Sequence, residues 1–331
     1  MTFKQNWEKT NQRFSLPQEK LMAMVAQAYP GSQLLQYEII EGGCANLNIK
    51  VWLENETQPL ILRVYLRDKA AAFREQKLAI LLHKTIPIPQ VYFIGDEGEY
   101  RFAIMEYREG ITLRELLLGN KPYDMGSIMY EVGQVLAKLQ ANQFIRSGMF
   151  DENLKVAEFI IPADYMTFAT LCLTHPRVVE TLGDEIIAKL RFYFEKYNVY
   201  FPNEDQHHLV HADFDPANIL VVNRQGKWQI SAILDWEFAF SSSSLWDVAN
   251  MLRYSHHLPD TFEKAFLQGL CQNGVELIEN WRICIYLLNC LSLLDCLVRS
   301  SFENQPNQCK DICQLIAYFV DSLAKITVTN V

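Results

Sequence analysis

One ten-residue stretch, HADFDPANIL at residues 211–220, constrains this chain more than any other part of its sequence. It places Asp213 five residues before Asn218, on a segment whose Asp and Pro residues are typical of a tight turn. An apolar run follows at once. A second apolar run, 230–234, ends in another acid, Asp235. The pattern predicts two strands with three oxygen-bearing side chains at their ends.

These three side chains have the chemistry that phosphoryl transfer from a nucleotide requires. One carboxylate accepts the proton of the acceptor hydroxyl, and an amide and a second carboxylate hold magnesium. The transition state depends on positioning and charge neutralisation more than on covalent chemistry. A turn would explain Asp213 alone, and Asn218 and Asp235 could each be ordinary turn or strand-end residues. Their combination in this order favours phosphoryl transfer.

The pattern HxDxxPxNIL followed by ILDW resembles the catalytic and metal loops of the aminoglycoside phosphotransferase family, which includes choline kinase-like small-molecule kinases. The resemblance implies that Asp213 is the catalytic base and that Asn218 and Asp235 are the ligands of magnesium. It also implies structural support from His211, which would pack under the loop. Asp247, at the start of a later helix, matches an acid that braces this loop.

Two residues of the loop depart from the usual family pattern, HGDxHxxNIL. Ala212 replaces the commoner Gly, which we expect to cost little provided that its backbone is not at positive φ. Asp215 stands where the family has His and where protein kinases have a phosphate-contacting Lys. An acid cannot attract the transferred phosphate. Three roles are therefore open for Asp215: binding a cation, binding a basic substrate, or slowing the chemistry.

The resemblance extends upstream to a nucleotide-binding lobe. The candidate nucleotide-binding residues are Gly42, Gly43, Asn46, Arg63, Glu75, Glu106 and Arg108. A Gly-Gly turn alone is a weak signal because plain hairpins contain it too. Arg63 interrupts an apolar strand and would contact phosphates, with Glu75 as its partner. Glu75 could equally be an exposed helix carboxylate. The adenine edge would meet backbone groups of Glu106 and Arg108.

Strand-like alternation gives way to helical periodicity from Leu113 onward, which predicts an α+β chain with two lobes. The resemblance implies that the two lobes form a bilobal protein-kinase-like fold. Residues 1–107 would form the nucleotide-binding lobe, with a helix at 17–29, a five-stranded antiparallel sheet and one helix after Arg67. Residues 108–331 would form a larger, mainly helical catalytic and substrate-binding lobe. The expected strands of the sheet are 36–41, 47–53, 60–65, 91–95 and 100–106. The expected elements of the larger lobe are helices at 112–119, 124–142, 156–173, 178–197, 245–256, 260–273, 278–302 and 307–326, and strands at 218–222 and 227–234.

Composition limits the partners of the chain. Half of its 331 residues are apolar, which is typical of a globular protein. Its net charge of −9 argues against a nucleic-acid partner. The N-terminus lacks the pattern of a signal peptide. The longest apolar run, 283–298, contains Asn289 and Asp295, so a buried helix explains it better than a membrane span. We expect a cytoplasmic protein without a membrane partner, and a disordered tail only in the first dozen residues.

Histidine and cysteine clusters offer a rival metal site. His207, His208 and His211 could imitate zinc ligands, but a fourth ligand would be needed and His211 would be taken from the loop. The eight cysteines lie mostly on apolar segments without CxxC pairs, so we expect most of them to be buried and reduced.

The sequence thus predicts an ATP- or GTP-dependent phosphotransferase that uses Mg²⁺ to move the γ-phosphate to a hydroxyl of a small molecule. An aminoglycoside or another cationic acceptor is among the candidates. Acidic residues of the C-terminal helices could meet such an acceptor, although surface charge explains them more often, namely Glu276, Glu279 and Asp295. The alternative is a non-catalytic kinase-like module that binds a nucleotide or a partner, which Asp215 favours. A protein kinase is disfavoured because the interval from Asp235 to Asp247 leaves no room for a long activation loop.

Overall fold

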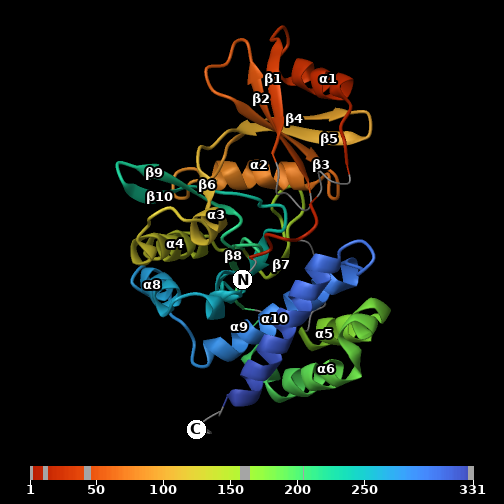
Figure 1. Cartoon of the computed structure of the whole chain (residues 1–331), viewed down its shortest axis with the longest axis vertical. Helices are drawn as coiled ribbons and strands as arrows, with labels where there is room; N and C mark the ends of the chain where they lie inside the picture. The colour runs from red at the N-terminus through yellow and green to blue at the C-terminus, as the bar shows by residue number, and fades with distance from the viewer. Residues whose placement is uncertain (1–2, 10–13, 41–45, 157–164, 204, 327–331) are drawn as a thin grey trace.

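The computed structural model has two lobes (Figure 1). Residues of both lobes line a cavity. The smaller lobe contains a sheet and two helices, and the larger lobe is mainly helical. This confirms the predicted α+β, bilobal fold, while the lobe boundary at residues 107 and 108 stays a prediction. The structure describes residues 3–9, 14–40, 46–156, 165–203 and 205–326.

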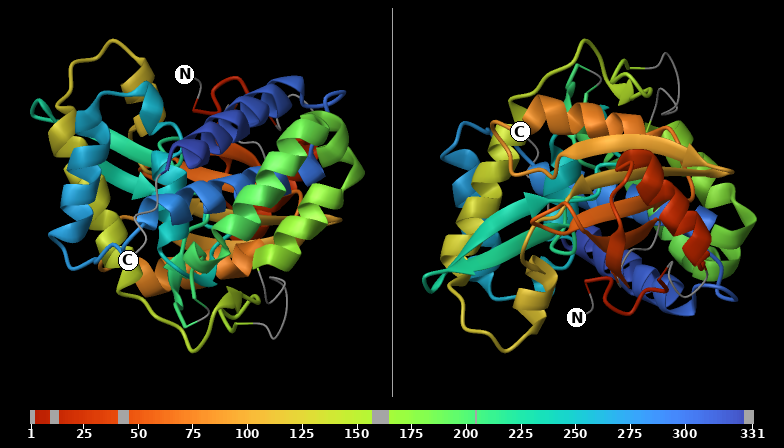
Figure 2. Two further views of the ribbon diagram at one scale, coloured as in Figure 1. Left: turned by 90° about the horizontal axis from the view of Figure 1, so that it is seen from below. Right: turned by 90° about the horizontal axis from the view of Figure 1, so that it is seen from above.

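The smaller lobe is built on a five-stranded antiparallel sheet with the order β1-β2-β3-β5-β4. In β2 every second side chain is buried, because successive side chains of a strand point to opposite faces. The buried set packs with α1 (Gln18–Ala28), which lies over the sheet in the right-hand view of Figure 2. The five predicted strands are confirmed with small shifts of their ends. They are β1 (Leu34–Ile39), β2 (Leu47–Leu53), β3 (Leu60–Tyr65), β4 (Val91–Glu97) and β5 (Tyr100–Glu106).

Helix α2 (Ala71–Leu82) lies between the sheet and the larger lobe. Its first turn packs small side chains, Ala71 and Ala72, against Ala103 and Met105 of β5. Its second half contributes to the core of the larger lobe. Small residues at the contact allow the helix to approach the sheet closely. Glu75 is thereby buried facing β3.

The larger lobe encloses its apolar side chains in one extended core. The predicted helices are present, with one change at 156–173. Val156 forms a β-bridge with Phe150, and residues 157–164 lie outside the described part of the chain. The helices are α3 (Leu113–Leu118), α4 (Met125–Gln140), α5 (Tyr165–Thr174), α6 (Pro176–Lys196), α7 (Leu245–Leu252), α8 (Asp260–Cys271), α9 (Trp281–Arg299) and α10 (Pro306–Lys325).

Helix α9 is apolar and long enough to cross a membrane by length and composition alone. In the fold it contacts α5, α6, α7 and α10, and the left-hand view of Figure 2 shows α10 beside it. Most of its apolar side chains are buried in the core of the larger lobe. This agrees with the predicted buried helix.

The loop with the HADFDPANIL sequence ends in a hairpin of β9 (Ile219–Arg224) and β10 (Lys227–Ile233), as predicted. Ile219 pairs with Ile233, and the Leu234 N–H donates to the Asn218 carbonyl at 2.8 Å. This register brings Asn218 and Asp235 to the same end of the hairpin. Four short strands were not predicted, because two or three residues give no readable periodicity: β6 (Ile111–Thr112), β7 (Gly148–Met149), β8 (His208–Val210) and β11 (Phe240–Ser242).

The N-terminal segment contradicts the expectation of a disordered tail over the first dozen residues. Phe3 and Trp7 are only 2% and 8% exposed, and both belong to the core of the larger lobe. In Figure 1 the red segment that precedes α1 runs into the middle of the molecule. The prediction is therefore wrong for residues 3–9, and residues 10–13 lie outside the description.

Candidate active site

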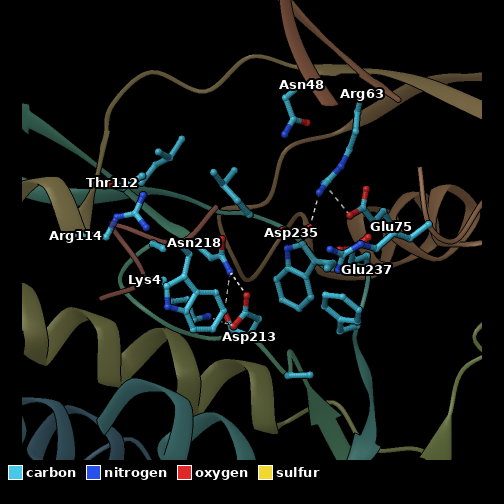
Figure 3. Close-up of a pocket in the computed structure, with 18 of the residues that line it drawn as sticks. Lys4, Asn48, Arg63, Glu75, Thr112, Arg114, Asp213, Asn218, Asp235 and Glu237 are labelled. Atoms are coloured by element: carbon cyan, nitrogen blue, oxygen red, sulfur yellow. Dashed lines mark hydrogen bonds and ion pairs between the residues drawn. The ribbon is translucent and has the colours of Figure 1, made fainter. Parts of the chain in front are cut away.

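A cavity of about 1270 Å³ opens between the lobes (Figure 3). Three of the predicted site residues, Asn46, His211 and Asp247, do not line it, and Gly42 and Gly43 fall outside the described residues. The predicted residues that line it are Arg63, Glu75, Glu106, Arg108, Asp213, Asn218 and Asp235.

Arg63 joins the two lobes through a pair of carboxylates. Its Nη1 donates to Glu75 Oε1 at 2.9 Å, and its Nη2 pairs with Asp235 from the larger lobe. The Tyr65 hydroxyl donates to the second oxygen of Glu75 at 2.5 Å. Burial raises the pKa of Glu75, and the neighbouring Arg63 acts in the opposite direction. Glu75 is 3% exposed, which excludes the alternative of a solvated helix carboxylate.

The end of β5 and the two residues after it line the cavity. The Glu106 N–H donates to the Gln90 carbonyl at 2.8 Å, and the Gln90 N–H donates to Glu106 Oε2 at 3.1 Å. Arg108 forms an ion pair with the Glu106 carboxylate at 3.0 Å. Because the Glu106 N–H is engaged, any contribution of this residue to an adenine edge would come from its carbonyl.

Asp213 is held from two sides at the bottom of the cavity (Figure 3). The Asn218 amide donates to Asp213 Oδ2 and to its carbonyl, each at 2.9 Å. The Lys4 ammonium lies 2.5 Å from Asp213 Oδ1 and also pairs with Asp215. Burial alone would raise the pKa of Asp213, but the charge and hydrogen bond of Lys4, together with the charges of Arg253 and His211, lower it. Asp213 is therefore ionised at neutral pH.

Asp247 and His211 fix the backbone beneath Asp213. The two Asp247 oxygens accept the N–H groups of His211 at 2.8 Å and Ala212 at 2.9 Å. His211 Nε2 lies 2.8 Å from the Leu234 carbonyl, which ties the loop to the end of β10. Burial raises the pKa of Asp247 to about 7, although the two N–H donors favour its ionised form. Both side chains are fully buried, so they act on the loop and not on a ligand.

Ala212 has φ of +71°, in the left-handed region that non-Gly residues avoid. The condition under which Ala212 was expected to cost little is therefore not met. Three hydrogen bonds hold this strained turn: the bonds from His211 N and Ala212 N to Asp247, and one at 2.7 Å from the Asn250 amide to the Ala212 carbonyl.

Glu237 is a site residue that the sequence reasoning missed. It lines the cavity, is 4% exposed and accepts a 2.7 Å hydrogen bond from the Asn46 amide. Burial raises the pKa of Glu237 to about 7. Its Oε1 and the Nε of Arg63 are buried atoms that find no hydrogen-bond partner among the described residues. A usable signal was present, because Glu237 follows Asp235 by two residues. Asn46, which was predicted to contact the nucleotide, bonds to Glu237 through its Nδ2 and accepts the Leu66 N–H on its Oδ1 at 3.2 Å.

The donor set suits a magnesium ion, which prefers oxygen ligands. The Asn218 amide nitrogen, Nδ2, makes both of its hydrogen bonds to Asp213, and the amide oxygen, Oδ1, is the atom that would bind the metal. Asp235 contributes a partly exposed carboxylate at the same end of the hairpin. Zinc has no comparable set, since the described residues contain no group of three His, Cys, Asp or Glu that could hold a metal. His208 Nδ1 lies against the Gln140 carbonyl at 2.8 Å.

In the larger lobe the cavity wall includes a group of aromatic side chains beside polar and charged ones such as Arg253 and Asp295. The aromatic group includes Tyr165, Phe168, Trp236, Phe240 and Trp246. Of the three acids considered for a cationic acceptor, Asp295 lines this cavity, and it forms an ion pair with Arg299 at 2.5 Å. Glu276 borders a separate depression beside Gln206.

Comparison with known proteins assigns the chain to a family. A family model described as "Phosphotransferase enzyme family" matches residues 36–282, well over half of the chain. The chain belongs to this family. The predicted resemblance to aminoglycoside phosphotransferases is confirmed by this match and by the relatives that follow.

A curated phosphotransferase, hygromycin-B 4-O-kinase of Escherichia coli, is 25% identical to the chain over 171 residues, which are 50% of the chain and 47% of that enzyme. The chain therefore spans about half the length of this relative. A ternary complex of a thermostable mutant of aminoglycoside phosphotransferase APH(4)-Ia superposes with a TM-score of 0.67 at 18% identity, covering 93% of the chain and 99% of that structure. The GDP complex of wild-type aminoglycoside 2'-phosphotransferase-IIIa gives 0.68 at 14% identity, covering 93% and 99%. These two likenesses establish the fold.

Proposed function

We propose that the chain is an ATP- or GTP-dependent phosphotransferase that uses Mg²⁺ and moves the γ-phosphate to a hydroxyl of a small molecule. One observation carries the proposal: Arg63 with Glu75 from one lobe and Asp213 with Asn218 from the other face a single cavity, with Asp235 between them. Two solved relatives of the same fold support it, since one holds AMP-PNP with hygromycin B and the other holds GDP.

On the acceptor side, Asp213 orients the hydroxyl and accepts its proton. A general base must be ionised and within hydrogen-bond reach of the hydroxyl. Ion pairing with Lys4 keeps Asp213 ionised, and the Asn218 amide fixes the direction of its carboxylate. His211 and Asp247 hold the turn that carries Asp213. Positioning of this kind accounts for a large share of catalysis in transfer reactions.

On the nucleotide side, Arg63 contacts the phosphates and Glu75 fixes the guanidinium. Asn218 and Asp235 would hold Mg²⁺, which when bound neutralises charge on the phosphates. Backbone groups at Glu106 and Arg108 would meet the base. We assign further nucleotide contacts to Gly42 and Gly43 from the family pattern, and we assign Asn46 the support of Glu237 at the cavity wall. We expect the protein to work in the cytoplasm.

The acceptor class follows from the family members of known activity. We propose a hydroxyl compound of small size, with aminoglycosides such as hygromycin B or kanamycin as the first candidates, because two solved relatives hold them. The aromatic walls near Tyr165 and Trp246 would contact the flat faces of such a molecule.

The test measures phosphate transfer from Mg-ATP and Mg-GTP to a panel of small hydroxyl compounds. Asp213→Asn should lower turnover more than about a hundredfold, as should Asp235→Ala. Asp184→Asn, an exposed acid on α6, provides the matched control and should leave turnover unchanged. Full activity in Asp235→Ala would contradict the assignment of the metal ligand. Nucleotide binding without turnover on any acceptor would favour the alternative of a non-catalytic kinase-like module.

A further inference from the structure

The N-terminal segment, residues 3–9, forms part of the wall of the catalytic cavity. Lys4 and Trp7 both line the cavity together with Asp213 and Asn218. Figure 3 shows Lys4 beside Asp213, on the side of the cavity away from Arg63. Lys4 and Asp213 lie 209 positions apart in the sequence. A lysine from the start of the chain thus reaches the centre of the predicted catalytic loop.

The segment is fixed by several contacts to the larger lobe. The Trp7 indole N–H donates to Asp311 Oδ2 at 2.9 Å, and the ring lies 5.7 Å from the Lys4 ammonium. The Phe3 ring lies 5.0 Å from that of Tyr254, which also donates to Asp311. Lys4 is therefore fixed from both directions along the chain, by Phe3 before it and by Trp7 after it.

Two more contacts involve the polar groups of the segment. The Glu8 carboxylate accepts the N–H groups of Asn307 at 2.9 Å and Gln308 at 3.3 Å, at the start of α10. Arg114 donates to the Phe3 carbonyl at 3.2 Å, and its own N–H donates to the Pro216 carbonyl in the catalytic loop at 2.8 Å. Segment and loop are therefore held by common neighbours, which gives Lys4 a defined position relative to Asp213.

Lys4 resolves the electrostatic problem that Asp215 creates. Asp213 and Asp215 are two residues apart, and Asp215 is only 5% exposed. Two carboxylates so close together repel each other and lose solvation when they are buried. The Lys4 ammonium contacts both of them. Arg253 also lines the cavity, and its charge helps to lower the pKa of Asp213, but its hydrogen bonds go to Asn250, Asn289 and Ser292 and not to either carboxylate.

The Asp215 carboxylate has a second task. Its Oδ1 accepts the Ala217 N–H at 2.8 Å, so it shapes the turn between Asp213 and Asn218. With one oxygen bound to that turn and the other to Lys4, Asp215 holds the ammonium against Asp213. The three groups form a bracket whose single cation comes from outside the loop.

We propose that Lys4 is a positioning residue of the catalytic loop, which orients the Asp213 carboxylate together with Asn218 and supplies the positive charge that the loop lacks at Asp215. This inference rests on the proposed phosphotransferase function. The ammonium faces the cavity at the point where acceptor and phosphoryl group would meet. It therefore counters the charge of the two carboxylates toward an incoming polyanion.

The experiment compares Lys4→Met, Lys4→Arg and the wild-type enzyme in phosphate transfer to the best acceptor of the panel. We expect Lys4→Met to lower kcat at least about tenfold while the KM for nucleotide changes less than about threefold, since positioning acts on the chemical step. Lys4→Arg should retain more activity than Lys4→Met, because it keeps the charge. Lys9→Met, on the same segment but outside the cavity lining, should leave kcat unchanged.

Chemical rescue separates the lost charge from a damaged fold. Lys4→Ala removes the three terminal carbons and the ammonium, which n-propylamine replaces. We expect n-propylamine to restore part of kcat in Lys4→Ala and n-propanol to restore none. A circular dichroism spectrum that matches the wild type establishes that the variants are folded. If Lys4→Met does not fold, the comparison of Lys4→Arg with Lys4→Gln serves instead, and equal kcat values in that pair would refute the proposal.

Two results would overturn the assignment of Lys4, and they differ from a failure of the proposed function. Wild-type kcat in folded Lys4→Met would refute the positioning role alone. A higher kcat in that variant would also refute it, and would show that the segment obstructs the acceptor. Absence of turnover in the wild-type protein on every acceptor would refute the proposed function, and the role of Lys4 with it.

Discussion

The buried pair of Arg63 and Glu75 permits a prediction in which the two partners have unequal effects. Glu75→Gln keeps the size of the side chain and an oxygen for the Tyr65 hydroxyl, but removes the charge opposite Arg63. Arg63 retains its second carboxylate, Asp235. The expected loss is that of one charge-assisted hydrogen bond, about 1.5–3 kcal/mol of the free energy of unfolding.

Arg63→Met is expected to do more damage. It leaves the Glu75 carboxylate at 3% exposure with the Tyr65 hydroxyl as its remaining partner. Removal of one member of a buried pair costs about 3–5 kcal/mol, because the other charge stays buried without compensation. The double variant, Arg63→Met with Glu75→Gln, should therefore be no less stable than Arg63→Met alone.

The assay is urea unfolding at pH 7 followed by tryptophan fluorescence, with the slope compared across variants to check that the same transition is measured. Glu54→Gln, an exposed glutamate of the same lobe, should change the free energy of unfolding by less than about 0.5 kcal/mol. The KM for nucleotide should rise in both site variants. Equal losses in Glu75→Gln and Arg63→Met, or a double variant that loses the sum of both, would refute the argument.

Two further predictions concern the turn beneath Asp213. Ala212→Gly removes the penalty of a left-handed backbone at φ +71° and should raise the free energy of unfolding by up to about 1 kcal/mol, measured by urea unfolding; a loss would contradict the strain. Asp247 gives a pH dependence, because its pKa rises from 3.8 to about 7 on folding. The folded state then holds a proton that the unfolded state has released, so this group's contribution to stability falls as pH rises from about 4 to 7. Asp247→Asn should make the free energy of unfolding fall less between pH 5 and 7 than it does in the wild type, as measured by urea unfolding at each pH. An unchanged dependence on pH would refute the role of this carboxyl group.

The hairpin of β9 and β10 could be predicted because its information is local. Asp213, Asn218 and Asp235 lie on one loop and the two strands after it, so turn chemistry and alternation were enough to bring them together. Arg63 and Glu75 were within reach for a similar reason, since a strand and the helix that follows it usually pack together. Their burial was not predictable, because a run of charged residues on a helix is as typical of a solvated face.

The contribution of Lys4 could not be predicted from local patterns. It depends on contacts that span the whole chain, such as those of Trp7 with Asp311 and Glu8 with Asn307. A short polar segment before the first helix has no periodicity, and composition alone favours a tail. The φ of Ala212 was also hidden, because a backbone angle imposed by Asp247 leaves no mark in the identity of the residue itself.

The two halves of the site share one electrostatic plan, in which a single buried cation serves two carboxylates. Arg63 serves Glu75 and Asp235, and Lys4 serves Asp213 and Asp215. Under the proposed function, one acid in each half takes part in the reaction, namely Asp235 or Asp213, and the other holds the cation in place. Removal of a cation leaves two acids uncompensated, whereas removal of a holding acid leaves the cation with its other partner. On both sides of the cavity, substitution of the cation, Arg63 or Lys4, should therefore lower the free energy of unfolding more than substitution of the holding acid, Glu75 or Asp215. This ordering follows from burial and charge alone.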